Sequence, residues 1–105
     1  MIYKKLVRDK IPDIIKKSGM IPIVEIINDD TYYNLLKTKL YEEYLEFKHS
    51  EEINELADIV EVIYAILDYK NISIEQFEKI RKGKIEDRGA FKDKIFLIET
   101  LKGEL

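Results

Sequence analysis

Apolar residues recur along most of this chain at the three- and four-residue intervals of an amphipathic helix. Leu36, Leu40 and Phe47 form one such stripe, and the polar run at residues 28–30 before it offers candidate N-cap residues. The pattern therefore predicts a long helix from about residue 28 to residue 47. Cap residues and breaks at glycine or proline predict three more helices, over about residues 12–17, 50–69 and 73–82, with Ser50 as the expected N-cap of the second of these.

Two segments lack the helical pattern and are rich in β-branched residues. Residues 22–27 read Pro-Ile-Val-Glu-Ile-Ile, and residues 94–98 read Lys-Ile-Phe-Leu-Ile. Because β-branched and aromatic side chains favour extended backbone, the two segments are candidates for a short two-stranded β element. The expected fold class is all-α, with a core of four helices in a single domain over residues 1–105.

The predicted third helix is apolar over almost its whole circumference between residues 53 and 67. A helix of that kind is normally buried on all sides. One chain of 105 residues offers three other helices to cover it, and one of them is very short. A second copy of the chain is the simplest cover for the rest, so the sequence predicts a homo-oligomer.

Composition narrows the class of function. The 18 basic and 21 acidic residues give a net charge of −3, which argues against nucleic-acid binding through a basic surface. The chain has no cysteine and one histidine, so a metal site must be built from carboxylates, which favours Mg²⁺ with Mn²⁺ as the alternative. With no apolar stretch long enough to cross a bilayer and no signal-peptide pattern at the N-terminus, we expect a cytoplasmic protein without a membrane partner.

Two pairs of carboxylates interrupt the apolar pattern of the second and third predicted helices. Glu43 falls in the apolar stripe with Glu46 three residues on, and Glu55 and Asp58 are three apart where the third helix becomes apolar. Residues three apart share one side of a helix, so two antiparallel helices can direct both pairs into one space. Anions buried together without partners are unfavourable, and a divalent cation is the simplest partner. A solvated acidic face is the alternative, and whether Glu61 joins the group stays open.

The acidic residues carry a resemblance to a known family. Glu42-Glu43-Tyr44-Leu45-Glu46, followed by Glu55-Leu56-Ala57-Asp58, resembles the EExxE…ExxD signature of the all-α nucleotide pyrophosphohydrolases. That superfamily includes MazG-like proteins, the phosphoribosyl-ATP pyrophosphohydrolases and the dimeric dUTPases. The opening Lys5-Leu-Val-Arg-Asp-Lys-Ile-Pro12 and the later Arg88-Gly89-Ala90-Phe91 are similar to a small MazG-like, phosphoribosyl-ATP pyrophosphohydrolase-like subgroup.

The resemblance implies a MazG-like four-helix bundle core assembled as a dimer or a tetramer. It implies a Mg²⁺-dependent enzyme that cleaves a nucleoside triphosphate to a monophosphate and pyrophosphate, with removal of non-canonical nucleotides as one role. It assigns Glu42 and Glu43 to catalysis, with Glu42 supporting the metal site. The metal ligands it implies form a four-carboxylate group: Glu43, Glu46, Glu55 and Asp58.

An anionic substrate also requires cations. Lys84 and Arg88, in the basic stretch after Gly83, are predicted to bind the substrate phosphates, and Arg8 and Lys10 rank behind them for the same role. The alternative for Lys84 and Arg88 is that they complement the C-terminal dipole of the fourth helix. The alternative function is a non-catalytic helical module that binds a nucleotide or a metal and regulates another process.

Overall fold

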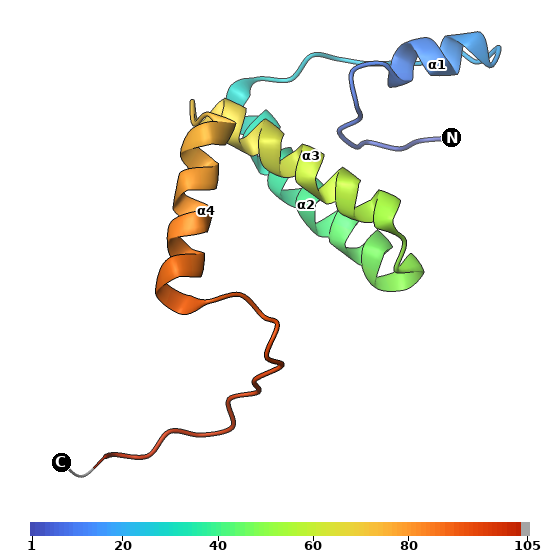
Figure 1. The fold of residues 1–105 in the computed structure, drawn as a ribbon. Coiled ribbons are helices and arrows are strands. Elements are labelled where there is room, and N and C mark those ends of the chain that lie inside the picture. The colour runs from blue at the N-terminus through green and yellow to red at the C-terminus, as the bar shows by residue number, and fades with distance from the viewer. Residues whose placement is uncertain (104–105) are drawn as a thin grey trace. The chain divides into compact units, whose positions relative to one another are not determined.

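The computed structural model describes residues 1–103 of the chain. Within these residues it contains α1 (Ile11–Lys17), α2 (Asp29–Ser50), α3 (Ile53–Tyr69) and α4 (Ile74–Arg88) (Figure 1). The described residues include no strand, so the predicted all-α class is confirmed. The chain divides after Ser73 into a first unit that holds α1, α2 and α3 and a second unit that begins with α4.

Glycine ends α1 as the sequence predicts. Gly19 has a φ of +91°, a backbone conformation that residues with a Cβ adopt only with strain. The Gly19 N–H donates to the carbonyl of Lys16 at 3.0 Å, and the Met20 N–H donates to the carbonyl of Ile15 at 3.3 Å. These two bonds form a Schellman motif, which satisfies carbonyls that a free helix end leaves without donors.

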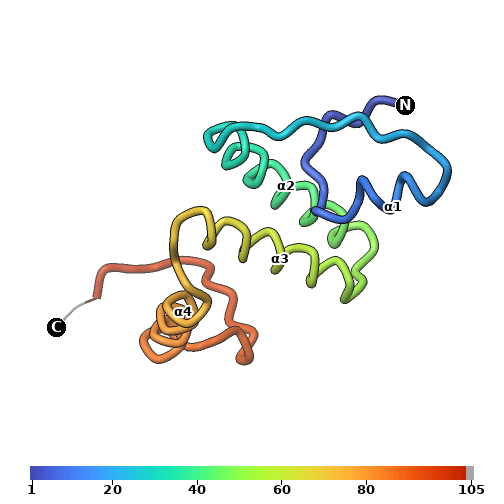
Figure 2. The backbone as a smooth tube through the Cα atoms, turned by 90° about the horizontal axis from the view of Figure 1, so that it is seen from above, coloured from blue at the N-terminus to red at the C-terminus, as the bar shows by residue number. Residues whose placement is uncertain are grey.

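In the first unit, α2 and α3 lie side by side as an antiparallel pair, the α2–α3 pair (Figure 2). Asn28 begins α2 as its N-cap, and its side-chain oxygen accepts the Thr31 N–H at 2.8 Å. Glu51 and Glu52 alone connect the two helices, with Glu51 in the left-handed conformation at a φ of +58°. The connection is therefore very tight, and it fixes which turns of α2 face which turns of α3.

The prediction that Ser50 caps the third helix is wrong. Ser50 is the last residue of α2, and Glu52 occupies the N-cap position of α3. The Ser50 hydroxyl accepts the Glu52 N–H at 3.2 Å. Because α2 continues for one more turn than the apolar stripe predicts, the hydroxyl stabilises the connection instead of the next helix.

The apolar core of the α2–α3 pair is small. Leu36 on α2 is buried, as are Val62 and Leu67 on α3. Tyr33 and Tyr69 stack at the end of the pair where α2 begins, with ring centroids 4.8 Å apart and ring planes 10° from parallel. In the first unit α1 makes no close backbone contact with either helix, so the α2–α3 pair is the packed core of this unit. No helix of the described residues is long and apolar enough to cross a membrane.

The predicted β element is absent from residues 1–103. The segments at 22–27 and 94–98 are not helical, but neither has strand pairing. A strand requires a second strand to bond with, and β-propensity measures the fit of a side chain to a half-buried pleated surface. Ile23 and Ile26 are each 97% exposed, so these side chains find no such surface among residues 1–103.

The fourth helix is longer than the sequence predicts. It runs through Gly83 and ends at Arg88, whereas a break at about residue 82 was expected. Glycine inside a helix costs about 1 kcal/mol relative to alanine, which the neighbouring turns tolerate. The break falls at Gly89, whose φ is +81° and whose N–H donates to the carbonyl of Ile85 at 2.8 Å.

Candidate metal centre

The tight connection between α2 and α3 brings the two predicted pairs of carboxylates together. Glu43 and Glu46 lie on the last turns of α2, and Glu55 and Asp58 lie on the first turns of α3. One carboxylate oxygen from each member of the four-carboxylate group lies within 4.8 Å of the corresponding oxygens of the other three. The juxtaposition that the helical spacing predicts is therefore present.

The four carboxylates differ in their access to solvent. Glu43 is 7% exposed, Glu55 and Asp58 are half-buried, and Glu46 is exposed. The group is thus closed on the side of Glu43 and open on the side of Glu46. A solvated cation can reach such a group from the open side and exchange part of its hydration water for carboxylate oxygens on the buried side.

The surroundings of Glu43 oppose the ionisation of its carboxyl group. Burial of its carboxylate, followed by the neighbouring Glu46 carboxyl, raises the pKa of Glu43, and Lys39 acts in the opposite direction. Glu43 Oε2 is buried and has no hydrogen-bond partner among residues 1–103. An unsatisfied buried oxygen is unfavourable. Coordination of a cation would satisfy it, and a donor set made only of carboxylate oxygens suits Mg²⁺ or Mn²⁺.

Two cations already contact the group. Lys39 Nζ lies 3.3 Å from Glu43 Oε1 and 3.6 Å from Glu42 Oε2, while Arg8 Nη2 lies 2.6 Å from Asp58 Oδ1. Together they offset at most two of the four negative charges. The remaining charge is what a divalent ion would neutralise.

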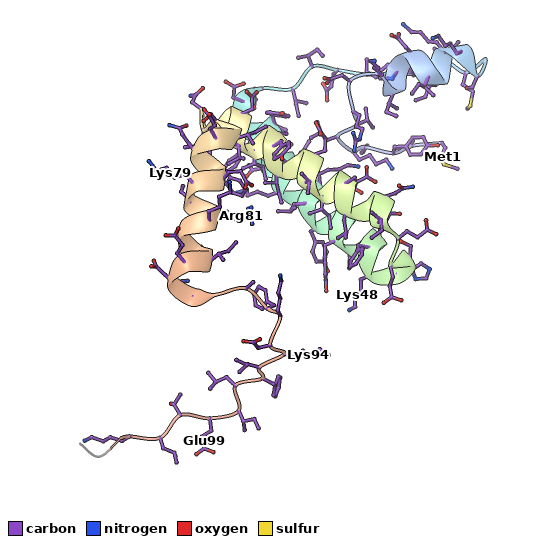
Figure 3. The ribbon with its side chains drawn as sticks, in the orientation of Figure 1. Met1, Lys48, Lys79, Arg81, Lys94 and Glu99 are labelled. Carbon is purple, nitrogen blue, oxygen red and sulfur yellow. The ribbon has the colours of Figure 1, made fainter. Side chains whose placement is uncertain are left out.

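Sequence reasoning did not predict either ion pair. Lys39 and Glu43 are four apart on one helix, a spacing that brings side chains together, so this signal was available. Arg8 and Asp58 are 50 residues apart, and no local pattern predicts their contact. Lys48 lies near the connection (Figure 3), and within the described part of the chain no ion pair involves it.

The other residues that the sequence singled out lie outside the four-carboxylate group. Glu42 is half-buried and holds the ion pair with the α2 lysine described above. Glu61 is exposed and does not join the group, and His49 is exposed in the last turn of α2. Lys84 and Arg88 are exposed residues of α4, in the second unit.

Comparisons with known proteins add one relative. An uncharacterized protein of Mycolicibacterium smegmatis is 40% identical to this chain over 47 residues, which cover 45% of this chain and 48% of that protein. The match thus spans about half the length of that relative, whose name states no activity. No family model matches the chain, and no solved structure matches it.

Proposed function

We propose that this protein is a Mg²⁺-dependent nucleoside triphosphate pyrophosphohydrolase that releases pyrophosphate and a nucleoside monophosphate. The observation that carries the proposal is the convergence of four carboxylates from two helices around Glu43 Oε2, a buried oxygen without a hydrogen-bond partner among the described residues. The resemblance of the same residues to the EExxE…ExxD signature supports it. Such an enzyme would work in the cytoplasm, where nucleoside triphosphates and Mg²⁺ are available.

The four-carboxylate group would hold the cation, Mg²⁺ or Mn²⁺. When bound, the ion would neutralise negative charge on the substrate phosphates as the phosphoanhydride breaks. A water molecule attacks the α-phosphorus and forms a new P–O bond, the bond from that phosphorus to the oxygen that bridges to the β-phosphate breaks, and pyrophosphate leaves with the bonding electron pair. Glu42 directly precedes Glu43 on α2, is half-buried and lies outside the four-carboxylate group, so we assign it as the acceptor of the proton from that water.

The cations of the second unit are proposed as phosphate contacts. Lys84 and Arg88 are exposed on α4, and Arg88 is the last residue of that helix. A guanidinium can bind two phosphate oxygens at once, and an ammonium acts as a point charge.

We also infer that the protein is a homo-oligomer. Ile53, Leu56 and Val60 follow one face of α3 and are 76%, 38% and 42% exposed. Tyr41 and Leu45, on α2, are also exposed apolar residues. Soluble monomers rarely expose a continuous apolar face, and a second copy with the same surface would cover it in a closed dimer or tetramer.

Pyrophosphate release from a panel of canonical and damaged nucleoside triphosphates, with Mg²⁺ or Mn²⁺, tests the proposed activity. We expect turnover of at least one nucleotide and its loss in Glu46→Gln. Glu61→Gln is the matched control, because Glu61 is an exposed carboxylate of the same helix pair outside the group. Nucleotide binding without product would instead identify the non-catalytic regulatory module. The absence of both binding and turnover would reject the proposal.

A further inference from the structure

An ion pair joins the N-terminal segment to the candidate metal centre. Arg8 Nη2 lies 2.6 Å from Asp58 Oδ1, although the two residues are 50 apart in the sequence. Asp58 belongs to the four-carboxylate group, and Arg8 comes from the segment that precedes α1 (Figure 1). The N-terminal segment therefore supplies a guanidinium to one of the four carboxylates.

The backbone holds Arg8 in place while its side chain stays accessible. The Arg8 carbonyl accepts the Ile11 N–H at 3.1 Å, which closes a turn at the start of α1, and Pro12 restricts the backbone that follows. The side chain of Arg8 is 56% exposed and that of Asp58 is 37% exposed. Ion pairs this accessible contribute little to stability. The ion pair between Arg8 and Asp58 therefore adds little to the free energy of unfolding, which leaves room for a role in ligand binding.

The guanidinium has donors to spare. Arginine carries five N–H groups, and among residues 1–103 only the Nη2–Oδ1 contact engages them. Its planar fork matches the oxygens of a phosphate group. A divalent ion that takes the Asp58 carboxylate would compete with Arg8 for the same oxygens and leave the guanidinium beside any phosphate bound to the ion.

We propose that Arg8 is a phosphate-binding residue of this centre. It pairs with Asp58 while no metal is bound, and it binds a phosphate oxygen of the substrate once the cation takes Asp58. This inference rests on the function proposed above and names the polyphosphate part of the substrate as the ligand of the N-terminal segment. Metal and polyphosphate then bind cooperatively, because the first releases the group that binds the second.

Isothermal titration calorimetry with two probes tests the role of Arg8: Mn²⁺ alone, and inorganic pyrophosphate in the presence of Mn²⁺. In Arg8→Ala we expect the affinity for Mn²⁺ alone to be unchanged or higher, since a competitor for Asp58 is lost. We expect the affinity for pyrophosphate to fall at least tenfold. Arg8→Lys should lie between Arg8→Ala and the wild type, because it keeps the charge and loses the fork. Lys16→Ala removes an exposed cation of α1 that is predicted to contact neither metal nor phosphate, so it is the matched control and should behave as the wild type.

Several outcomes would overturn the inference. One is pyrophosphate affinity in Arg8→Ala equal to that of the wild type. Another is a parallel loss of Mn²⁺ and pyrophosphate affinity, which would make Arg8 a support for Asp58 and not a phosphate ligand. If Arg8→Ala fails to fold, Arg8→Lys decides, since the inference requires weaker pyrophosphate binding at unchanged Mn²⁺ affinity. A wild-type protein that binds no Mn²⁺ would reject the proposed function itself, and this inference with it.

Discussion

Replacing Glu43 with glutamine should make the metal-free protein more stable and the metal-bound protein less stable than the wild type. Glu43 is 7% exposed, and its Oε2 has no hydrogen-bond partner within residues 1–103. Burial and the neighbouring Glu46 carboxyl raise its pKa, so ionisation of Glu43 opposes folding when no cation is bound. Glutamine keeps the shape of the side chain and removes the charge.

The size of the effect follows from two opposing terms. An unsatisfied buried polar group costs about 1–3 kcal/mol, and the glutamine amide can donate to the Glu46 carboxylate and so relieve part of this cost. The substitution gives up the ion pair with Lys39, which for residues four apart on one helix is worth about 0.5 kcal/mol, while Lys39 keeps Glu42 at 3.6 Å. The metal-free free energy of unfolding should therefore rise by about 1 kcal/mol, or roughly 4–8 °C in Tm for a chain of this size.

The effect should depend on pH with a definite sign. A glutamate whose folded-state pKa is raised binds its proton more tightly in the folded state than in the unfolded state. The wild-type free energy of unfolding then falls as the pH rises from the ordinary glutamate value of 4.5 through the raised pKa of Glu43. Glu43→Gln lacks this fall. The two proteins should differ least below pH 4.5 and most above the raised pKa.

Thermal and urea unfolding followed by circular dichroism, at one fixed protein concentration, measure these differences in EDTA and in Mn²⁺. At a hundredfold excess over its dissociation constant, a ligand that binds only the folded state adds about 2.7 kcal/mol to the stability of the wild type. The variant should gain much less. Glu42→Gln is the matched control, because Glu42 also contacts Lys39 but is not one of the four carboxylates. It should change the free energy of unfolding by less than about 0.5 kcal/mol. A Glu43→Gln protein that is less stable than the wild type in EDTA, or equally stabilised by Mn²⁺, would refute the reasoning.

Three further predictions concern the metal ligands, the assembly and the fold. Glu46→Gln and Asp58→Asn should each lower the affinity for Mn²⁺ at least tenfold by calorimetry. Each should leave the metal-free protein at least as stable as the wild type, because the repulsion among the carboxylates is relieved. Unchanged Mn²⁺ affinity, or lower stability of both variants, would contradict the metal site. Val60→Glu should shift the protein towards monomer in sedimentation equilibrium at micromolar concentration, and a wild-type protein that is already monomeric would refute the predicted oligomer. Asn28→Ala removes the N-cap of α2 and should cost about 1 kcal/mol in urea unfolding without changing Mn²⁺ affinity; equal stability would show that the cap contributes nothing.

Much of the local structure could be predicted from the sequence because its causes lie within a few residues. Asn28 caps α2 through Thr31, three residues on, and Gly19 ends α1 through bonds to the turn before it. The pairing of Glu43 with Glu46 on one side of α2 likewise follows from helical spacing. The all-α class was predictable for the same reason.

The tertiary structure alone decided which of these local features meet. The convergence of the four carboxylates within 4.8 Å depends on a connection of two residues, one of them left-handed at Glu51, and helical periodicity does not specify that conformation. The contact of Arg8 with Asp58 depends on the path of the N-terminal segment over 50 residues. The β-branched segment at 22–27 shows the converse: its composition favours a strand, but a strand forms only where the fold supplies a partner. Helices close their hydrogen bonds within four residues, whereas metal centres, ion pairs and sheets join distant parts of the chain, so only the folded chain determines them.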